Sequence, residues 1–200
     1  MMITKIRSFL WVLYLKFKGA SIGRNFLVQG PLKILLRDGA KWSNICIGDD
    51  VTFGGKVFIR LRKNGRIVLK DGVKTGTHVW LVGANDADLK IENNSIIGSY
   101  NILNGGHGLE IGKYCIFAAF VYINTSDHNF NKNELIQNQG FFGSKITVGD
   151  DVWLGGHVFI NKGVKIGDGS IIGAGAVVIK DIPKYSIAVG NPAKVIKKRE

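Results

Sequence analysis

Aliphatic residues recur at every sixth position through the last part of the chain. This period matches neither the 3.6-residue period of an α-helix nor the two-residue period of a plain strand. Hexapeptide repeats are typical of a parallel β-helix, in which each repeat supplies one short strand and one corner. The aliphatic positions are Val148, Leu154, Ile160, Ile166, Ile172 and Val178.

A second set of small or β-branched residues follows four positions after each aliphatic one. Its members are Val152, Val158, Val164, Ser170 and Ala176. Gly or Asn directly follows the aliphatic residue, which suits positive φ or a tight corner. Earlier apolar sets, at 22–34, 47–59, 67–79, 91–103 and 111–123, continue the rhythm, with Asn85 as a polar rung or a loop. Three hexads make one triangular coil, so the sequence predicts an all-β parallel β-helix of about seven coils, stacked at ~4.8 Å.

The N-terminal segment has a different pattern. Residues 3–18 predict a basic amphipathic helix, with Ile6, Leu10, Leu13 and Phe17 on one stripe. Its apolar run is shorter than the ~20 residues that span a bilayer, and no small-residue cleavage site of a signal peptide follows it. The helix is expected to cap the open end of the coil, to attach to a membrane surface, or to do both. The predicted boundaries are 1–20 for the helix, 21–196 for the β-helix with a loop at 128–147, and 197–200 for a basic tail.

Net charge indicates which classes of partner the protein could bind, and cysteine usage indicates its cellular compartment. The chain has 27 basic and 15 acidic residues, a net charge of +12. The basic residues are scattered and carry no nucleic-acid motif, so phosphorylated small molecules and anionic membrane surfaces are the better candidates. Cys46 and Cys115 fall inside repeats and are expected to be reduced. Together these features predict a cytoplasmic protein, with peripheral contact at the inner face of the cytoplasmic membrane as an option.

One long insertion interrupts the repeats. Twenty-five positions separate Ile123 from Val148, where one hexad takes six. Long loops on a rigid scaffold are common homes for function. His128 stands at the root of this loop, and histidine is the usual general base near neutral pH. A lone loop histidine is more often a surface residue, but this position favours catalysis.

The other histidines give weaker signals. His107 takes a slot of the second set, either as a corner residue or as part of an acceptor pocket. His78 and His157 are expected at solvated outward corners. A metal site needs three converging ligands, and the chain lacks a close His pair, so none is expected. Trp153 is expected to point outward, where it would pack on a neighbouring subunit or a ligand.

Residues 146–198 resemble the C-terminal half of the hexapeptide-repeat O-acetyltransferases, closest to the lipopolysaccharide or capsule and the galactoside or maltose enzymes. The segments IGAGAVV, DIP and GNPAKVI carry the likeness, and TSDHN at the loop root resembles the lipopolysaccharide and capsule variant. The resemblance implies a left-handed β-helix, a homotrimer with active sites between subunits, and acetyl-CoA as donor. It requires no metal.

The same resemblance assigns roles by position. His128 would be the catalytic base. The donor would contact Trp153, Gly156, Ala174, Ile179 and Lys180, with Lys194 and Lys197 near its nucleotide end. Candidates for acceptor contact are Asn101, Asn104, His107 and Asp127. Because neighbours along a strand face opposite ways, the group that orients His128 is expected from another coil rather than from Asp127. The acidic acceptor-binding residue of the galactoside enzymes maps near Gly106 and is absent here, which argues against a simple galactoside acceptor.

The leading hypothesis is therefore acetyl transfer from acetyl-CoA to a sugar hydroxyl, in surface polysaccharide or lipopolysaccharide biosynthesis. Alternatives are transfer to another small acceptor, such as an amino sugar, serine or an antibiotic, a carbonic-anhydrase-like metalloenzyme on the same fold, and a non-enzymatic scaffold subunit. A bound metal found by metal analysis would favour the metalloenzyme over the acetyltransferase. Binding of acetyl-CoA would exclude the scaffold subunit.

Overall fold

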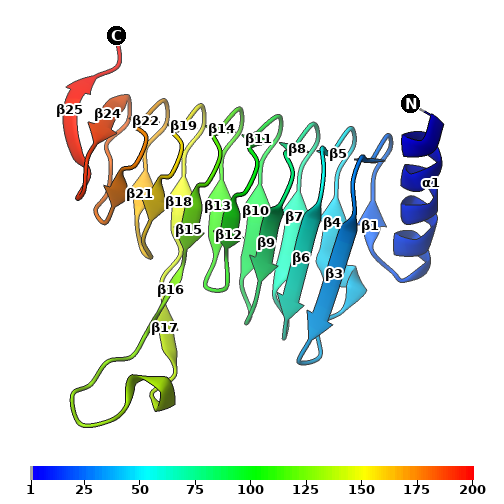
Figure 1. Cartoon of the computed structure of the whole chain (residues 1–200), viewed down its shortest axis with the longest axis horizontal. Coiled ribbons are helices and arrows are strands. Elements are labelled where there is room, and N and C mark those ends of the chain that lie inside the picture. The colour runs from blue at the N-terminus through cyan, green and yellow to red at the C-terminus, as the bar shows by residue number, and fades with distance from the viewer. Residues whose placement is uncertain (1) are drawn as a thin grey trace.

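The computed structural model describes residues 2–200 as a solenoid of parallel β-strands with one helix across its N-terminal end (Figure 1). Each coil contributes one strand to each of three sheets, and all pairs are parallel except the last pair of sheet 2, β24 with β25. Sheet 1 contains β1 (Ser21–Ile22), β4 (Ile45–Ile47), β7 (Arg66–Leu69), β10 (Asp88–Ile91), β13 (Leu109–Ile111), β18 (Ile146–Val148) and β21 (Lys165–Ile166). The predicted all-β solenoid of about seven coils is confirmed, while its left hand stays a prediction.

The other two sheets run alongside the first. Sheet 2 contains β2 (Leu27–Val28), β5 (Thr52–Phe53), β8 (Lys74–Thr75), β11 (Ile96–Ile97), β14 (Ile116–Phe117), β19 (Trp153–Leu154), β22 (Ile171–Ile172), β24 (Ser186–Val189) and β25 (Lys194–Lys198). Sheet 3 contains β3 (Leu32–Arg37), β6 (Val57–Arg62), β9 (Val79–Gly83), β12 (Ile102–Asn104), β15 (Tyr122–Asn124), β20 (Phe159–Ile160) and β23 (Val177–Val178). Its first three strands are the longest, so sheet 3 is widest in the N-terminal coils.

The core follows the hexapeptide pattern. The six repeat positions from Val148 to Val178 are at most 2% exposed, and the second set is buried as well. Of the earlier apolar positions, only Ile34 is half-buried. A buried Leu or Ile of this kind typically contributes 2–5 kcal/mol relative to Ala, so the stack of inward side chains holds the coils in register.

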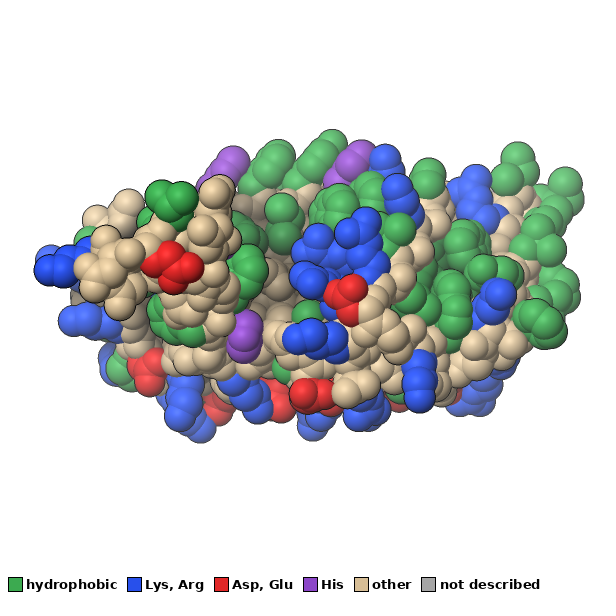
Figure 2. Space-filling view, turned by 90° about the horizontal axis from the view of Figure 1, so that it is seen from below, with side chains coloured by type: hydrophobic (Ala, Val, Ile, Leu, Met, Phe, Trp, Pro, Cys, Tyr) green, Lys and Arg blue, Asp and Glu red, His purple; other side chains and the backbone are tan. Residues whose placement is uncertain are grey.

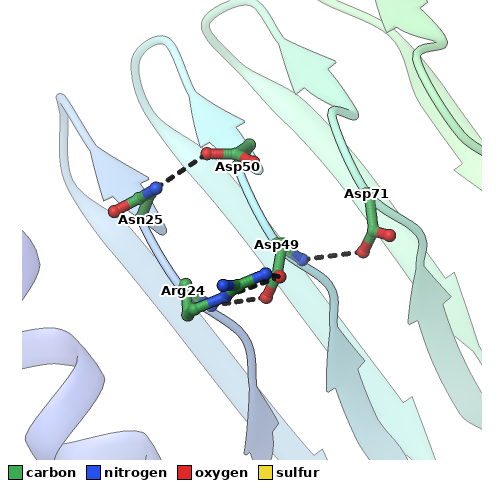
Figure 3. A network of polar contacts seen from close by, with 5 residues as sticks. All are labelled: Arg24, Asn25, Asp49, Asp50 and Asp71. Carbon is green, nitrogen blue, oxygen red and sulfur yellow. Dashed lines mark hydrogen bonds and ion pairs between the residues drawn. The ribbon is translucent and has the colours of Figure 1, made fainter.

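Aspartates and glycines shape the corner between sheets 1 and 2. The Asp49 carboxylate accepts the Arg24 backbone N–H at 2.7 Å and the Asp71 carboxylate accepts the Asp49 N–H at 2.8 Å, so each coil ties down the coil before it (Figure 3). A Cβ at Gly23 would lie within 2.5 Å of the Asp49 carboxylate and the next backbone. These glycines are therefore required for close approach between coils, rather than for the positive φ that the sequence also suggested.

The helix α1 (Met2–Phe17) closes the N-terminal end of the core. Its inner face carries Leu15, which is fully buried, and Ser8, whose hydroxyl accepts the Val28 N–H at 2.8 Å. The predicted apolar stripe does not make this contact: Ile6, Leu10, Leu13 and Phe17 are 53%, 59%, 52% and 86% exposed. The helix thus caps the coil through one face and presents a second apolar face to solvent. No helix within residues 2–200 is long and apolar enough to cross a membrane.

Two segments leave the regular coil. Strands β16 (Ser126–His128) and β17 (Phe141–Gly143) form an antiparallel pair at the base of a projecting arm, residues 126–143, which includes a 3-10 turn at Ile136–Asn138. A second 3-10 turn covers Trp42–Asn44. The C-terminal residues return as β25, antiparallel to β24. The tail predicted at 197–200 therefore begins inside a strand, and the arm begins two residues before the predicted loop.

Candidate active site at the base of the arm

The arm is fixed to the coil by buried hydrogen bonds at Thr125. This side chain is fully buried, donates to the Asn104 carbonyl at 2.8 Å and accepts the His107 backbone N–H at 3.1 Å. On the returning strand, a Cβ at Gly143 would overlap the His107 ring, so glycine allows β17 to lie against that ring. The base of the arm, with His128 on it, is therefore held by the rigid coil.

The strand pairing decides which arm residues share a face. Ser126 pairs with Gly143 and His128 pairs with Phe141, while Asp127 pairs with Phe142 between them. Directly opposed residues of an antiparallel pair point the same way, and successive residues alternate. His128, Phe141 and Ser126 therefore lie on one face of the arm, and Asp127 lies on the other.

The opposite face of the arm is anchored by a lysine. The Lys162 ammonium group forms an ion pair with the Asp127 carboxylate and lies 4.6 Å from the centroid of the Phe142 ring. Both ion-pair partners are partly buried, and the cation–π contact adds to the attraction. Asp127 is thus engaged by Lys162 on the face away from His128, which argues against the acceptor contact expected for it.

A cavity of about 370 Å³ opens where the arm meets the outer surface of sheet 3. Its basic side consists of Arg60, Arg62 and Lys63. The remaining lining residues are Val82, Ala84, Asn85, Asn104, Gly106, His107, Ser126 and Phe141. In the view from below, Lys and Arg side chains gather beside the arm (Figure 2). The cavity is thus basic on one side and bounded by the arm on the other.

His128 does not line this cavity itself, but it lies on the same arm face as two residues that do, Ser126 and Phe141. Its imidazole is exposed and faces the Phe141 ring with 4.2 Å between centroids. No hydrogen bond to the His128 ring is formed within residues 2–200. Both ring nitrogens are therefore available to groups from outside this chain, as a general base requires for one of them.

Two of the expected acceptor residues lie in the cavity wall. The Asn104 amide donates to the Asn124 side chain at 2.9 Å, which orients it at the arm root. His107 contributes a ring whose Nδ1 is buried without a hydrogen-bond partner in the described part of the chain. His107 is thus a partly buried corner residue that also lines the cavity, and its part in acceptor binding stays a prediction.

Asn101 lies inside the coil, contrary to the acceptor role expected for it. It is fully buried, its amide donates to the Ala118 carbonyl at 3.0 Å, and its oxygen accepts the Val121 N–H at 2.6 Å. These bonds satisfy two backbone groups at the corner, and an aliphatic residue in place of Asn101 would leave both groups unpaired. Asn101 is a structural residue with no surface through which to reach a ligand.

The expected donor residues lie along the C-terminal coils. Trp153 is 52% exposed in a row of outward side chains on sheet 2, between Ile116 and Ile171. Gly156 and Ala174 lie in successive coils at the corner between sheets 2 and 3, where the Gly175 N–H donates to the Gly156 carbonyl at 2.8 Å. The structure therefore brings these three residues to one edge of the coil.

The remaining donor candidates lie at the C-terminal end of this region. Ile179 follows β23 and is 49% exposed, and Lys180 beside it is exposed. Lys194 and Lys197 lie on β25, opposite Val189 and Ile187, and their side chains are exposed. All four side chains are accessible to a ligand that lies along the last coils.

A ladder of stacked rings, which the sequence did not predict, occupies the same corner in the coil of Gly156 and in the three coils before it. Neighbouring ring centroids are 4.9 Å apart for His78 and Tyr100, 5.0 Å for Tyr100 and Phe120, and 4.7 Å for Phe120 and His157. All four residues have positive φ. His78 and His157 are corner residues as expected, but each stacks on a neighbour. Their separations of 22, 20 and 37 residues conceal the ladder until the coils are in register.

Comparison with known proteins agrees with the repeats. Residues 145–180 match the family model described as bacterial transferase hexapeptide (six repeats). A probable acetyltransferase of Mycobacterium tuberculosis is 38% identical over 120 residues, which cover 60% of this chain and 40% of that protein. A putative acetyltransferase of Staphylococcus aureus is 47% identical over 75 residues, 37% of each chain. The matches thus span less than half the length of these two relatives.

Solved structures share the fold along almost the whole chain. AntD, an N-acyltransferase from Bacillus cereus solved with dTDP-4-amino-4,6-dideoxyglucose and coenzyme A, has a TM-score of 0.65 at 21% identity, covering 95% of this chain and 89% of its own. The polySia-specific acetyltransferase NeuO has a TM-score of 0.52 at 26% identity, covering 90% of this chain and 86% of its own. The repeats, the sequence relatives and the shared fold relate this chain to the hexapeptide-repeat acetyltransferases.

Proposed function

We propose that the protein transfers an acetyl group from acetyl-CoA to a hydroxyl of a sugar, with His128 as general base. The observation that carries this proposal is the placement of His128 on a rigidly anchored arm, beside a polar cavity and with a free imidazole. The relationship to acetyltransferases supports the reaction type. NeuO, which is specific for polySia, and AntD, solved with a dTDP-linked amino sugar, support a sugar acceptor.

The chemistry assigned to His128 is proton transfer. One ring nitrogen removes the proton from the acceptor hydroxyl as that oxygen attacks the thioester carbonyl. The tetrahedral intermediate collapses to the acetyl ester, and the imidazolium returns the proton to the departing thiolate of coenzyme A. General-base help of this kind contributes about 10²–10⁴-fold.

Acetyl-CoA is proposed to lie along the edge formed by Trp153, Gly156 and Ala174. The exposed indole of Trp153 offers a flat apolar surface, and the small residues at the corner leave backbone groups accessible. Ile179 and Lys180 continue this edge, and Lys194 and Lys197 supply positive charge for the phosphates at the nucleotide end.

The functional unit is proposed to be a homotrimer. Trp153, Ile116 and Tyr100 are 52%, 51% and 46% exposed on neighbouring coils, which is a large apolar surface for a monomer. In such an assembly a neighbouring subunit would supply the orienting group for His128, whose ring has no hydrogen bond from within residues 2–200. Sedimentation of a stable monomer at micromolar concentration would contradict the trimer.

The acceptor is proposed to belong to surface polysaccharide or lipopolysaccharide synthesis at the cytoplasmic side of the membrane. The TSDHN segment and the absence of an acidic cavity residue support this class over simple galactosides. The outward apolar face of α1, with Lys5, Lys16 and Lys18 exposed around it, supports peripheral contact with anionic lipid.

The test is a direct transferase assay. Purified full-length protein is mixed with acetyl-CoA and a panel of sugars, and free thiol is followed together with the mass of the acceptor. Acetylation of a sugar hydroxyl is the expected result. Tight coenzyme binding without transfer to any hydroxyl, or transfer only to amines, would overturn the proposed reaction.

A further inference from the structure

The cavity beside the arm holds positive charge that the protein itself does not balance. Three of its lining residues, Arg60, Arg62 and Lys63, are basic, and none is Asp or Glu. Arg62 pairs with Asp38 at 2.7 Å, and the Lys63 ammonium donates to the Asn85 side chain at 3.3 Å. Within residues 2–200, Arg60 and Lys63 both lack a carboxylate partner, and Arg60 also lacks any side-chain hydrogen bond.

The burial of Arg60 makes this arrangement costly without a ligand. Its side chain projects from β6 onto the outer surface of sheet 3, is partly buried, and has its Nε buried without a partner. Buried polar groups are normally paired, and a charged donor left unpaired is destabilising. The His107 Nδ1, in the wall of the same cavity, is likewise buried without a partner. Both atoms are covered by protein, so a ligand in the cavity would meet the other guanidinium N–H groups of Arg60, which make no hydrogen bond within residues 2–200.

We infer that the acceptor carries an anionic group, a phosphate ester or a carboxylate, that binds Arg60 in this cavity; the inference rests on the proposed acetyl transfer. A guanidinium matches either anion because its planar N–H groups donate in pairs to two oxygens. A neutral sugar offers hydroxyl acceptors but no negative charge, so it would leave the charge of Arg60 unbalanced.

The geometry connects this charge to the reacting end of the acceptor. Arg60 pairs along sheet 3 with Val82, which pairs with Asn104, which in turn pairs with Asn124 at the arm root. Three strand spacings separate Arg60 from this root, about 14 Å. An arginine side chain and a short glycoside together cover that span. The anionic group thus fixes one end of the acceptor at Arg60, while a hydroxyl at the other end lies beside the arm face that carries His128.

The experiment compares three acceptor probes of similar size, namely glucose 1-phosphate, glucuronic acid and methyl glucoside. Wild-type protein is expected to bind at least one of the two anionic probes at least tenfold more tightly than methyl glucoside in calorimetry without donor. Preference for glucose 1-phosphate assigns the anion as a phosphate ester, and preference for glucuronic acid assigns a carboxylate. Equal or absent binding of all three probes would overturn the inference.

Variants locate the binding to one side chain. Arg60→Gln should weaken binding of the preferred anionic probe at least tenfold and reduce its salt dependence, while Arg60→Lys restores part of the affinity. Arg66→Gln is the matched control, because Arg66 is a surface arginine paired with Asp88 outside the cavity. An anionic probe that binds equally well to wild type and Arg60→Gln would contradict the site.

The outcome is separable from that of the proposed function. Transfer to neutral sugars with the same kcat/KM as to anionic ones, in wild type and in Arg60→Gln, leaves the acetyltransferase standing and overturns the inference. Arg60-dependent binding of an anionic probe, with no thiol release from acetyl-CoA, supports the site and contradicts the reaction.

Discussion

His128 and Phe141 face each other across the β16–β17 pair, with 4.2 Å between ring centroids and an angle of 44° between the ring planes. The aromatic ring restricts the imidazole on one side without occupying either nitrogen. The arm root below them is held by Thr125, and the opposite face is held by Lys162. Among residues 2–200, the catalytic candidate is thus positioned by packing rather than by a hydrogen bond to its ring.

His128→Ala should lower acetyl transfer at least ~100-fold, because it removes the group that accepts the hydroxyl proton. Affinity for coenzyme A should stay close to that of wild type, since the donor candidates lie on the coil edge rather than on the arm. The measurement is steady-state thiol release together with calorimetric coenzyme binding. His78→Ala serves as control, because His78 stacks on Tyr100 away from the arm. Near-full turnover of His128→Ala would exclude His128 from the chemistry.

The repeating part of the fold could be predicted from the sequence, because every sixth residue there is buried. Val148, Leu154 and Ile160 are inward since each hexad makes one side of a triangle, and the structure confirms this. The N-terminal coils are less regular: Ile59 and Ile67 are eight positions apart, and the extra residues extend β6 and the turn after it. Arg60 lies in this interruption, which was the available signal for a functional position.

The contents of the candidate site were less predictable because they depend on register between coils. Antiparallel pairing across the arm brings Phe141 to His128. The hexapeptide period does not extend into the arm, so it could not predict this pairing. Asn101 and Asn104 are only three residues apart, yet one satisfies backbone groups in the core and the other lines the cavity. Their roles differ because the Asn101 side chain points into the coil and the Asn104 side chain points outward, which residue type alone does not predict.

Cys115 should be unreactive in the folded protein. Burial raises the pKa of its thiol to about 11, and only the thiolate is nucleophilic. At pH 8 the thiolate fraction is therefore about 10⁻³, and it rises tenfold per pH unit until the pH reaches the pKa. In a Cys46→Ser variant, labelling by a disulfide reagent should be at least ~100-fold slower in buffer than in denaturant.

The matched control for that experiment is Cys115→Ser, which leaves the half-buried Cys46 as the remaining thiol. Cys46 should be labelled faster than Cys115 in buffer. Rapid labelling of Cys115 in the folded protein at pH 8 would show that the coil opens locally at this corner, contrary to its full burial.

Charge reversal at Lys194 and Lys197 should weaken donor binding. If these exposed lysines on β25 contact the phosphates of coenzyme A, the double change to Glu removes two attractions and adds two repulsions. Affinity should fall at least tenfold at low salt, and its dependence on salt concentration should become shallower. Calorimetric titration of coenzyme A at several ionic strengths measures both quantities.

The control for the donor experiment is Lys41→Glu with Lys70→Glu, which changes the net charge equally at two exposed positions far from the C-terminal coils. If both double variants weaken binding to the same degree, the effect is a long-range one of net charge. Unchanged affinity of Lys194→Glu with Lys197→Glu at every ionic strength would rule out the assigned contact.

The outward face of α1 should bind anionic membranes reversibly. Ile6, Leu10 and Leu13 are more than half exposed, so a bilayer surface can bury them without disturbing the cap formed by the other face. Each buried CH₂ contributes ~0.8 kcal/mol, and each basic residue near anionic lipid about 1 kcal/mol. We therefore expect full-length protein to float with phosphatidylglycerol vesicles at low salt and to remain in solution with phosphatidylcholine.

The informative variant replaces those three side chains together: Ile6→Gln, Leu10→Gln and Leu13→Gln. Deleting the helix would uncover Val28 and other buried residues of the first coil, whereas these substitutions change only exposed side chains. The variant should keep its urea unfolding midpoint and lose flotation. Leu135→Gln with Ile136→Gln, on exposed residues of the arm, controls for lost surface hydrophobicity in general. If wild type also stays in solution with anionic vesicles, α1 acts only as the cap of the coil, and the membrane part of the proposal fails while the acetyl-transfer part is unaffected.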